Sequence, residues 1–378
     1  IIKLSIIFKI NKTLALTMSK AIFIIILVTL KAVNINSSGA NYLGRQSIKD
    51  ISHKLSYKQP SNSQLIGNYS TVHRDYYESD NDELCPNAED IYPCQCDYVR
   101  RSVASYSLYL RCDNVTSEDE LSNVFNAYFP IKNFTSFFIS DNQYIKVLET
   151  DIFNNVSFDN FVFFNTSLEE IQNGAFSSSY EALDTFVAYK NNIHTFPFED
   201  LSKCSRLRIL NLAHSPLISV PADEFQGIST LEGIFIENDD TTFTGNYQSL
   251  SNLTELDLSF NNITFIPSSF CKTGSSQLKK VDLGHNRIDK VEPDAFDSVY
   301  WLWISMRGNY LTTLDEATWK PLLEAKVRLQ ASNNPLDCGC DIAWLYAEPH
   351  LLEQITDDTT CRDGQNIHNL NSHIFDNC

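Results

Sequence analysis

The chain has 378 residues, with 47 acidic and 29 basic side chains and a formal net charge of −18 at pH 7. A negative surplus of this size argues against nucleic acid or an anionic membrane surface as the main partner. Ten cysteines in one chain are typical of a compartment in which disulfides form.

The first forty residues contain a candidate export signal. A start at Met18 is followed by an apolar run over 21–30, with the small residues Ser38 and Ala40 placed before a cleavage site. The run is too short to span a bilayer, which takes about 20 residues, so a signal peptide is favoured over a signal anchor. Residues 1–40 are therefore interpreted as upstream residues and a signal peptide. Removal of their five lysines brings the net charge to about −23.

Two segments lie between this signal and the rest of the chain. Residues 41–84 are polar and acidic and show no periodicity, which predicts a disordered segment. Residues 85–133 contain a cluster of cysteines, including a C-x-C pair: Cys85, Cys94, Cys96 and Cys112.

A repeating frame dominates the remainder of the chain. It is clearest over 253–267, LTELDLSFNNITFIP, which has the form L-x-x-L-x-L-x-x-N-x-L. The frame recurs every 22 to 25 residues, with first positions at Phe134, Phe158, Leu183, Leu207, Leu231, Leu253, Leu278, Trp301 and Lys326. This frame and period are those of a leucine-rich repeat. Residues 134–333 are therefore predicted to form an α/β solenoid, a horseshoe with a parallel sheet on its concave face.

Each unit is expected to place a short strand around its fourth and sixth positions. No unit can bury its apolar side chains alone, so stacking supplies the core. The ninth position carries an amide that can both donate and accept hydrogen bonds to the backbone of adjacent turns. It holds Asn142, Asn191, Asn261, Asn286, Asn309 and Asn334, with Thr166, Ser215 and Asp239 in the other units.

A second cysteine cluster follows the repeats in residues 334–378: Cys338, Cys340, Cys361 and Cys378. A solenoid has two open ends that must be capped, and C-x-C pairs at both ends of an exported chain predict disulfide-stapled caps. Zinc ligation by these cysteines is the alternative to disulfides, and export disfavours it because it disfavours free thiolates. Cys204 and Cys271 lie nearly three repeats apart, about 14 Å in strand spacings. That distance exceeds the ~7 Å limit for a disulfide, so both are expected to be buried free thiols.

Glycan acceptors are frequent in the predicted mature chain. Seven N-x-S/T sequons occur after residue 40, at Asn68, Asn114, Asn133, Asn155, Asn165, Asn252 and Asn262. In an exported chain several of these should carry glycan.

No catalytic signature is found in the sequence. The metalloprotease, nucleophile-elbow, phosphate-loop and dinucleotide motifs are missing, and His214 and His285 lie about 14 Å apart in the repeat column, too far to share a metal. We therefore expect no enzyme activity, cofactor or metal site.

The concave face instead offers variable side chains at the second, third, fifth, seventh and eighth positions. Exposed aromatic residues rimmed by charge favour a partner-binding face, although aromatic residues in strands also occur for β propensity alone. The candidates are Phe138, Phe164, Val187, Tyr189, Phe235, Glu237, Glu255, Asp257, Lys280, Asp282, Trp303, Arg307 and Arg328.

The cap motif CPNAEDIYPCQC is much more specific than the leucine frame. With NVTSEDELSNVFNAYFP, IKVLETDIFNN, TWKPLLEAKVRL and NNPLDCGCDIAWL, it resembles secreted arthropod proteins related to the non-catalytic subunit of Oplophorus-luciferin 2-monooxygenase. The resemblance runs from about Cys85 to Cys378. It implies a leucine-rich accessory chain that binds or stabilises another secreted protein and has no catalysis of its own. Resemblance to such caps also implies the pairs Cys85–Cys96, Cys94–Cys112, Cys338–Cys361 and Cys340–Cys378.

The sequence thus predicts a secreted, glycosylated, non-enzymatic leucine-rich-repeat protein whose partner is another secreted protein, such as a catalytic subunit. No nucleic acid partner and no membrane span are expected. An extracellular pattern-recognition or matrix protein is the alternative within binding proteins, and a structural spacer is the alternative from another class.

Overall fold

The structure is a computed structural model that describes residues 84–102, 105–217, 219–220, 225, 228–237, 242–243, 250–271, 277–296 and 302–378. All of these belong to one compact unit, Asn81–Cys378. The predicted signal peptide, the segment 41–83, the sequon Asn68 and the ninth-position residue Asp239 lie outside the described residues.

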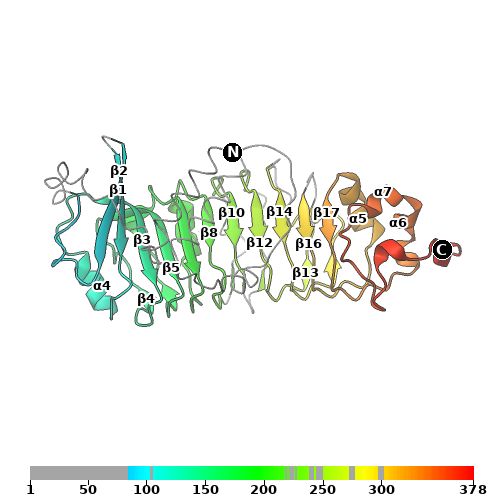
Figure 1. Ribbon diagram of the computed structural model, residues 1–378, viewed down its shortest axis with the longest axis horizontal. Helices are drawn as coiled ribbons and strands as arrows, with labels where there is room; N and C mark the ends of the chain where they lie inside the picture. Colours follow the sequence, from blue (N-terminus) through cyan, green and yellow to red (C-terminus); the bar gives the residue numbers. More distant parts are fainter. Residues whose placement is uncertain are drawn as a thin grey trace, which may run out of the picture. The chain divides into compact units, whose positions relative to one another are not determined.

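Repeating strands form the main sheet (Figure 1). In the described part of the chain it has eleven strands, of which the first two pair antiparallel and the others pair parallel. In order across the sheet they are β1 (Gln95–Ser102), β2 (Ser105–Arg111), β3 (Asn133–Ser140), β5 (Ser157–Phe164), β7 (Thr185–Tyr189), β8 (Ile209–Asn211), β10 (Gly233–Phe235), β12 (Glu255–Asp257), β14 (Lys280–Asp282), β16 (Trp303–Ser305) and β17 (Arg328–Gln330).

In some repeats the strand of the main sheet is followed by a second, short strand, and these short strands pair in parallel with those of the next repeat. They are β4 (Val147–Leu148) with β6 (Glu170–Ile171), β9 (Ser219–Val220) with β11 (Thr242–Phe243), and β13 (Phe265–Ile266) with β15 (Lys290–Val291). The α-helices in the described residues are α4 (Glu118–Val124), α5 (Glu316–Glu324), α6 (Ala343–Ala347) and α7 (Pro349–Leu352). The 3₁₀ helices are η2 (Ser177–Ser179), η3 (Phe198–Lys203), η4 (Cys340–Ile342), η5 (Ile367–Asn369) and η6 (Ser372–Phe375).

The core is continuous from the first cap to the last, as stacking of dependent units requires. Its composition changes along the solenoid. In the first repeats the leucine positions are held by phenylalanines, and Phe137, Phe153, Phe158 and Phe161 pack with ring centroids 4.9–6.0 Å apart. The later repeats bury leucine and isoleucine at the same positions, for example Leu256.

The ninth-position asparagines form a buried ladder, with 2–5% of each residue exposed. Asn286 is representative. Its Nδ2 donates to the carbonyl oxygens of Leu258 (2.9 Å) and Leu283 (3.0 Å), and its Oδ1 accepts from the amide of Ile263 (3.0 Å). One side chain thereby satisfies backbone groups of its own turn and of the preceding one, which is the role expected for the amide.

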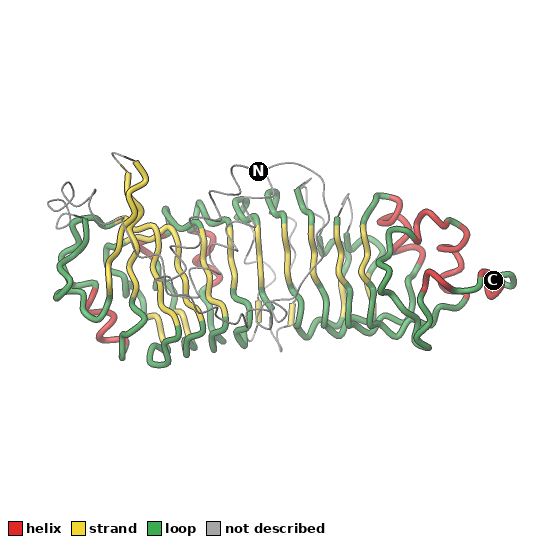
Figure 2. The backbone as a smooth tube through the Cα atoms, viewed as in Figure 1, coloured by secondary structure: helices red, strands yellow, loops and turns green. Residues whose placement is uncertain are grey.

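Both caps are held by two disulfides each: Cys85–Cys96, Cys94–Cys112, Cys338–Cys361 and Cys340–Cys378. These are the pairs that the family resemblance implied. The helical segments of the C-terminal cap lie beyond β17, the last strand of the row (Figure 2). The indole Nε1 of Trp344 in α6 donates to the carbonyl of Leu314 (3.0 Å), which ties this cap to the last repeats.

The amino-terminal cap differs from the expectation in one respect, because it also contributes to the sheet. The hairpin β1–β2 joins the row through β2, where Tyr109 pairs with Ser136 and Arg111 with Phe138. The sheet therefore begins before the first repeat.

Cys204 and Cys271 are buried free thiols. Burial raises the pKa of each to about 12, so the unreactive thiol form dominates at neutral pH. Within the described residues, we find no helix with the length and apolar character needed to cross a membrane.

Candidate binding face of the sheet

Side chains alternate along each strand, so the third, fifth and seventh positions of every repeat point away from the core. We call this surface the open face. The strand register aligns its fifth positions into one column: Phe138, Val162, Val187, Asn211, Phe235, Asp257, Asp282, Ser305 and Gln330.

An aromatic strip crosses the carboxyl ends of β5, β7 and β8, and we define it as Phe164, Tyr189 and His214. The rings of Phe164 and Tyr189 are stacked, with centroids 5.8 Å apart and planes at 7°. His214 meets Tyr189 edge to face at 4.8 Å, and its Nε2 lies 3.3 Å from a carboxylate oxygen of Glu237. Phe164 and Tyr189 are only partly buried, so solvent reaches a preformed row of rings.

Phe138 was predicted to be an exposed aromatic of this face, and this prediction is wrong. Only 5% of the residue is exposed. The Arg111 guanidinium lies 5.3 Å from its ring centroid and the Tyr109 ring lies 6.3 Å away. Both come from β2, which sequence analysis had assigned to the cap alone. The alternation in SYSLYLR, with Leu108 and Leu110 buried between polar or aromatic side chains, is the signal that could have revealed this strand.

The middle of the open face is formed by Phe235, which is partly exposed beside Gly233. A Cβ at position 233 would lie 2.8 Å from the Phe235 ring and 3.1 Å from the Ile209 side chain. Glycine is therefore needed here so that the ring can lie against the strand. Val187, two strands away in the same column, is also partly exposed.

The later repeats present charge, which we call the Lys280 cluster: Glu255, Asp257, Lys280 and Asp282. The Lys280 Nζ lies 2.7 Å from Glu255, 3.4 Å from Asp257 and 3.8 Å from Asp282. Three carboxylates thus surround one partly buried ammonium group. Lys280 is consequently a structural counterion as well as a surface charge.

Asp257 was expected to be freely exposed, which is also wrong, since only 8% of the residue is exposed. Its Oδ1 accepts hydrogen bonds from the amide (3.1 Å) and the hydroxyl (2.7 Å) of Ser259. Asp282 binds the amide of Gly284 in the same way (3.1 Å). These fifth-position acids therefore terminate their strands, and burial together with Asp282 raises the pKa of Asp257.

Glu237 lies between the aromatic strip and the Lys280 cluster. Burial raises its pKa to about 7, with further contributions from the charges of Asp257 and Asp282 and an opposing one from Lys280. The carboxyl group therefore titrates near neutral pH, beside the rings of the strip.

Three further candidates lie at the last repeats. Trp303 is partly buried and Arg307 and Arg328 are exposed. The Arg328 guanidinium lies 5.7 Å from the Trp303 ring centroid, within the range of a cation–π contact.

Five sequon asparagines are exposed: Asn114, Asn133, Asn155, Asn165 and Asn252. Asn262 is partly buried. Asn133 begins β3 and Asn165 follows β5, so the two lie at opposite ends of neighbouring strands.

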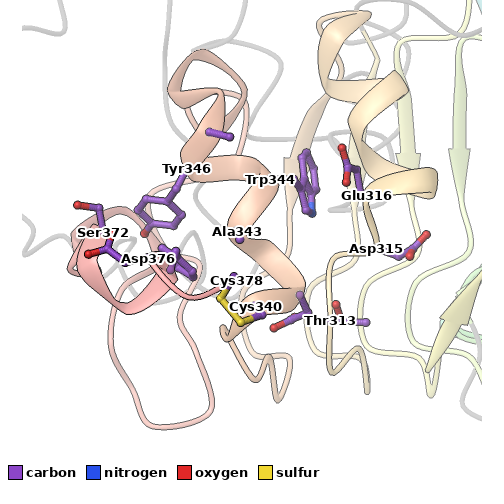
Figure 3. A pocket seen from close by; sticks show the side chains of 13 residues that line it. Thr313, Asp315, Glu316, Cys340, Ala343, Trp344, Tyr346, Ser372, Asp376 and Cys378 are labelled. Carbon is purple, nitrogen blue, oxygen red and sulfur yellow. A yellow bond between two sulfur atoms is a disulfide. The ribbon is translucent and has the colours of Figure 1, made fainter.

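A hollow of about 840 Å³ lies in the C-terminal cap, beside the Cys340–Cys378 disulfide (Figure 3). Its acidic side chains are already bound locally. Asp315 accepts from the amide of Thr318 (3.1 Å), Asp341 accepts from Gly339 (2.7 Å), and Asp376 pairs with His373 (3.0 Å). Across the described residues, no group of three or more His, Cys, Asp or Glu side chains could hold a metal ion.

These features define a leucine-rich-repeat solenoid with disulfide-linked caps. The leucine rich repeat family model matches residues 251–311. Among solved structures, the TLR13–ssRNA13 complex matches with a TM-score of 0.51 and 20% identity, covering 59% of this chain and 31% of that chain. At this identity the likeness concerns the fold alone.

Among curated proteins, the chain is similar to the non-catalytic subunit of Oplophorus-luciferin 2-monooxygenase from Oplophorus gracilirostris. The two are 29% identical over 317 residues, which cover 77% of this chain and 87% of that protein. This confirms the resemblance drawn from the cap and repeat motifs. The CD180 antigen of Mus musculus is 26% identical over 177 residues, covering 44% of this chain and 26% of that protein.

Proposed function

We propose that this chain is a secreted, non-enzymatic binding protein that docks another secreted protein on the amino-terminal half of the open face. The observation that carries the proposal is the aromatic strip. Phe164 and Tyr189 are stacked, partly exposed and fixed by the register of β5 and β7. Preorganised aromatic residues lose little conformational freedom on binding and often supply most of the binding energy of an interface.

Similarity to a subunit named as non-catalytic supports a protein partner and a role without catalysis. The four cap disulfides support an oxidising compartment. The charges of the Lys280 cluster and of Arg307 are suited to steering the partner and setting its orientation.

The test is isolation of the tagged chain from the native secretion under non-reducing conditions. A protein recovered in a fixed stoichiometric ratio is the expected result. Retention on glycans or microbial surfaces would favour the pattern-recognition alternative instead. Recovery of the chain alone would favour the alternative that the protein is a structural spacer, and would contradict the proposal.

A further inference from the structure

The eighth position of the repeats has a left-handed backbone in every unit where the structure describes it. The residues with φ between 53° and 68° at this position are Asp141, Asn165, Lys190, His214, Phe260, His285, Gly308 and Asn333. Gly, Asn, Asp and His tolerate this region, whereas a bulky side chain seldom occupies it. Lys190 and Phe260 are the residues of the column outside this set, and Phe260, with φ 56°, is the bulky aromatic one.

The Phe260 ring is also unusually accessible, with 46% of the residue exposed. It stacks on His285 with centroids 4.4 Å apart and planes at 12°. Next in the column is Gly308, where a Cβ would lie 2.9 Å from the Nδ1 of His285. A bulky aromatic residue with a left-handed backbone and a half-exposed ring indicates that something covers the ring.

A pocket of about 250 Å³ lies beside this stack. Phe260, His285 and Gly308 line it from the eighth positions, and Asn262, Arg287 and Tyr310 line it from the tenth. The two rows cross three consecutive repeats, so the pocket extends for about two strand spacings, roughly 10 Å. Its long axis therefore runs from Asn262 past Arg287 towards Tyr310.

Asn262 is also the first residue of the sequon Asn262-Ile263-Thr264. We propose that an N-linked glycan on Asn262 fills this pocket, with its first sugar rings packed against Phe260 and His285. The inference rests on the proposed secretion, because the glycan is added only during export. Asn262 itself lines the pocket, so a glycan linked to its Nδ2 begins at the pocket wall.

The lining suits a sugar on chemical grounds. The C–H groups of a pyranose ring are apolar and pack on the aromatic residues, while its hydroxyl groups meet the exposed Arg287 guanidinium and the exposed Tyr310. Covalent attachment adds a high effective concentration, so a contact that is weak in free solution becomes occupied. The glycan then covers the rim of the repeats that begin at Leu253, Leu278 and Trp301.

The first experiment treats the native secreted protein with a peptide-N-glycosidase and compares the rate of glycan release at Asn262 with the rate at a second site. Site occupancy is followed by mass spectrometry, with the glycan on exposed Asn155 as the matched control. Release at Asn262 should be at least tenfold slower than at Asn155. In a Phe260→Asn protein, whose new side chain tolerates φ 56°, release at both sites should proceed at similar rates. An unmodified Asn262, equal rates in the original protein, or slow release that persists in Phe260→Asn would each overturn the proposal.

The second experiment measures thermal unfolding. Thr264→Ala removes the sequon through an exposed side chain and should lower the Tm by about 2 °C. In the Phe260→Asn background it should lower the Tm by less than half as much. Equal shifts in the two backgrounds would contradict a role for the chain's own glycan. Recovery of the partner is measured separately on the same Thr264→Ala protein. This result tests docking on the aromatic strip, whereas the Tm values test the glycan, so failure of either proposal can be recognised.

Discussion

Asn191 shows how one side chain holds two repeats together. Its Nδ2 donates to the carbonyl of Phe163 (3.1 Å), and its Oδ1 accepts from the amide of Thr166 (3.2 Å). The residue is 5% exposed, so water cannot replace these bonds. Its neighbour Asn192 is exposed and has the same chemistry. Burial rather than residue type therefore decides what the amide contributes.

Asn191→Ala should destabilise the protein by about 2–3 kcal/mol, because two buried backbone groups of the preceding repeat lose their partner. Asn192→Ala is the matched control and should change stability by less than about 0.5 kcal/mol. Urea unfolding followed by circular dichroism measures both. Similar losses in the two variants would show that the ladder is not the source of the stability.

The Glu237 carboxyl group gives the protein a predictable pH dependence. Its folded-state pKa of about 7 is above its ordinary value of 4.5. The folded protein therefore binds more protons than the unfolded chain between these values, and this contribution to stability is lost as the pH rises through 7. Glutamine at this position cannot ionise. The free energy of unfolding of Glu237→Gln minus that of the original protein should therefore be larger at pH 8 than at pH 5, by about 1–2 kcal/mol.

Urea unfolding at the two pH values checks this prediction, with exposed Glu181→Gln as the control. His214, Asp257, Asp282 and Lys280 surround Glu237 in both proteins, so only the difference between the variants is informative. A difference that does not change with pH would contradict the raised pKa.

At the scale of elements, the repeat period was enough to predict the strands, their parallel stacking and the buried asparagines. A fixed period constrains every unit at once, because each must bury its face against the next. The sheet's first two strands, β1 and β2, were missed because they precede the repeats, and the local alternation of SYSLYLR in β2 is the signal they offer. The exposure of Phe138 and Asp257 was wrong for a related reason. Alternation predicts the face on which a side chain lies but not which neighbours bury it there. Side chains of β2 bury Phe138, and Ser259 contacts Asp257.

The caps should be the elements most sensitive to reduction. Cys340 and Cys378 are 38 residues apart, and Cys338 and Cys361 are 23 apart, so each bridge should contribute about 3–4 kcal/mol by restricting the unfolded chain. Reductant should therefore lower the Tm sharply. A Cys338→Ala/Cys361→Ala protein should start with a lower Tm and respond less to reductant, as measured by scanning calorimetry. An unchanged Tm in this variant would show that the C-terminal cap is held by packing alone.

At the scale of the whole molecule, the solenoid separates its stabilising parts from its variable surface. The asparagine ladder and the apolar core lie within the repeats, and the disulfides lie in the caps. The aromatic strip belongs to neither, because its rings stack on the opposite side of the strands from the core. Changes in the strip should therefore alter binding with little effect on folding.

The central claim is that the aromatic strip binds the partner, and the affinity of a Phe164→Ala/Tyr189→Ala protein tests it most directly. The measurement uses the protein that co-purifies with the original chain, and Tyr128→Ala serves as a control because Tyr128 is 79% exposed and lies outside the main sheet. Loss of two anchors should weaken binding by about 2 kcal/mol or more, roughly thirtyfold, with an unchanged circular dichroism spectrum. Tyr128→Ala should bind normally. Unchanged affinity of the double variant, with the fold intact, would contradict the account and place the binding site elsewhere on the protein.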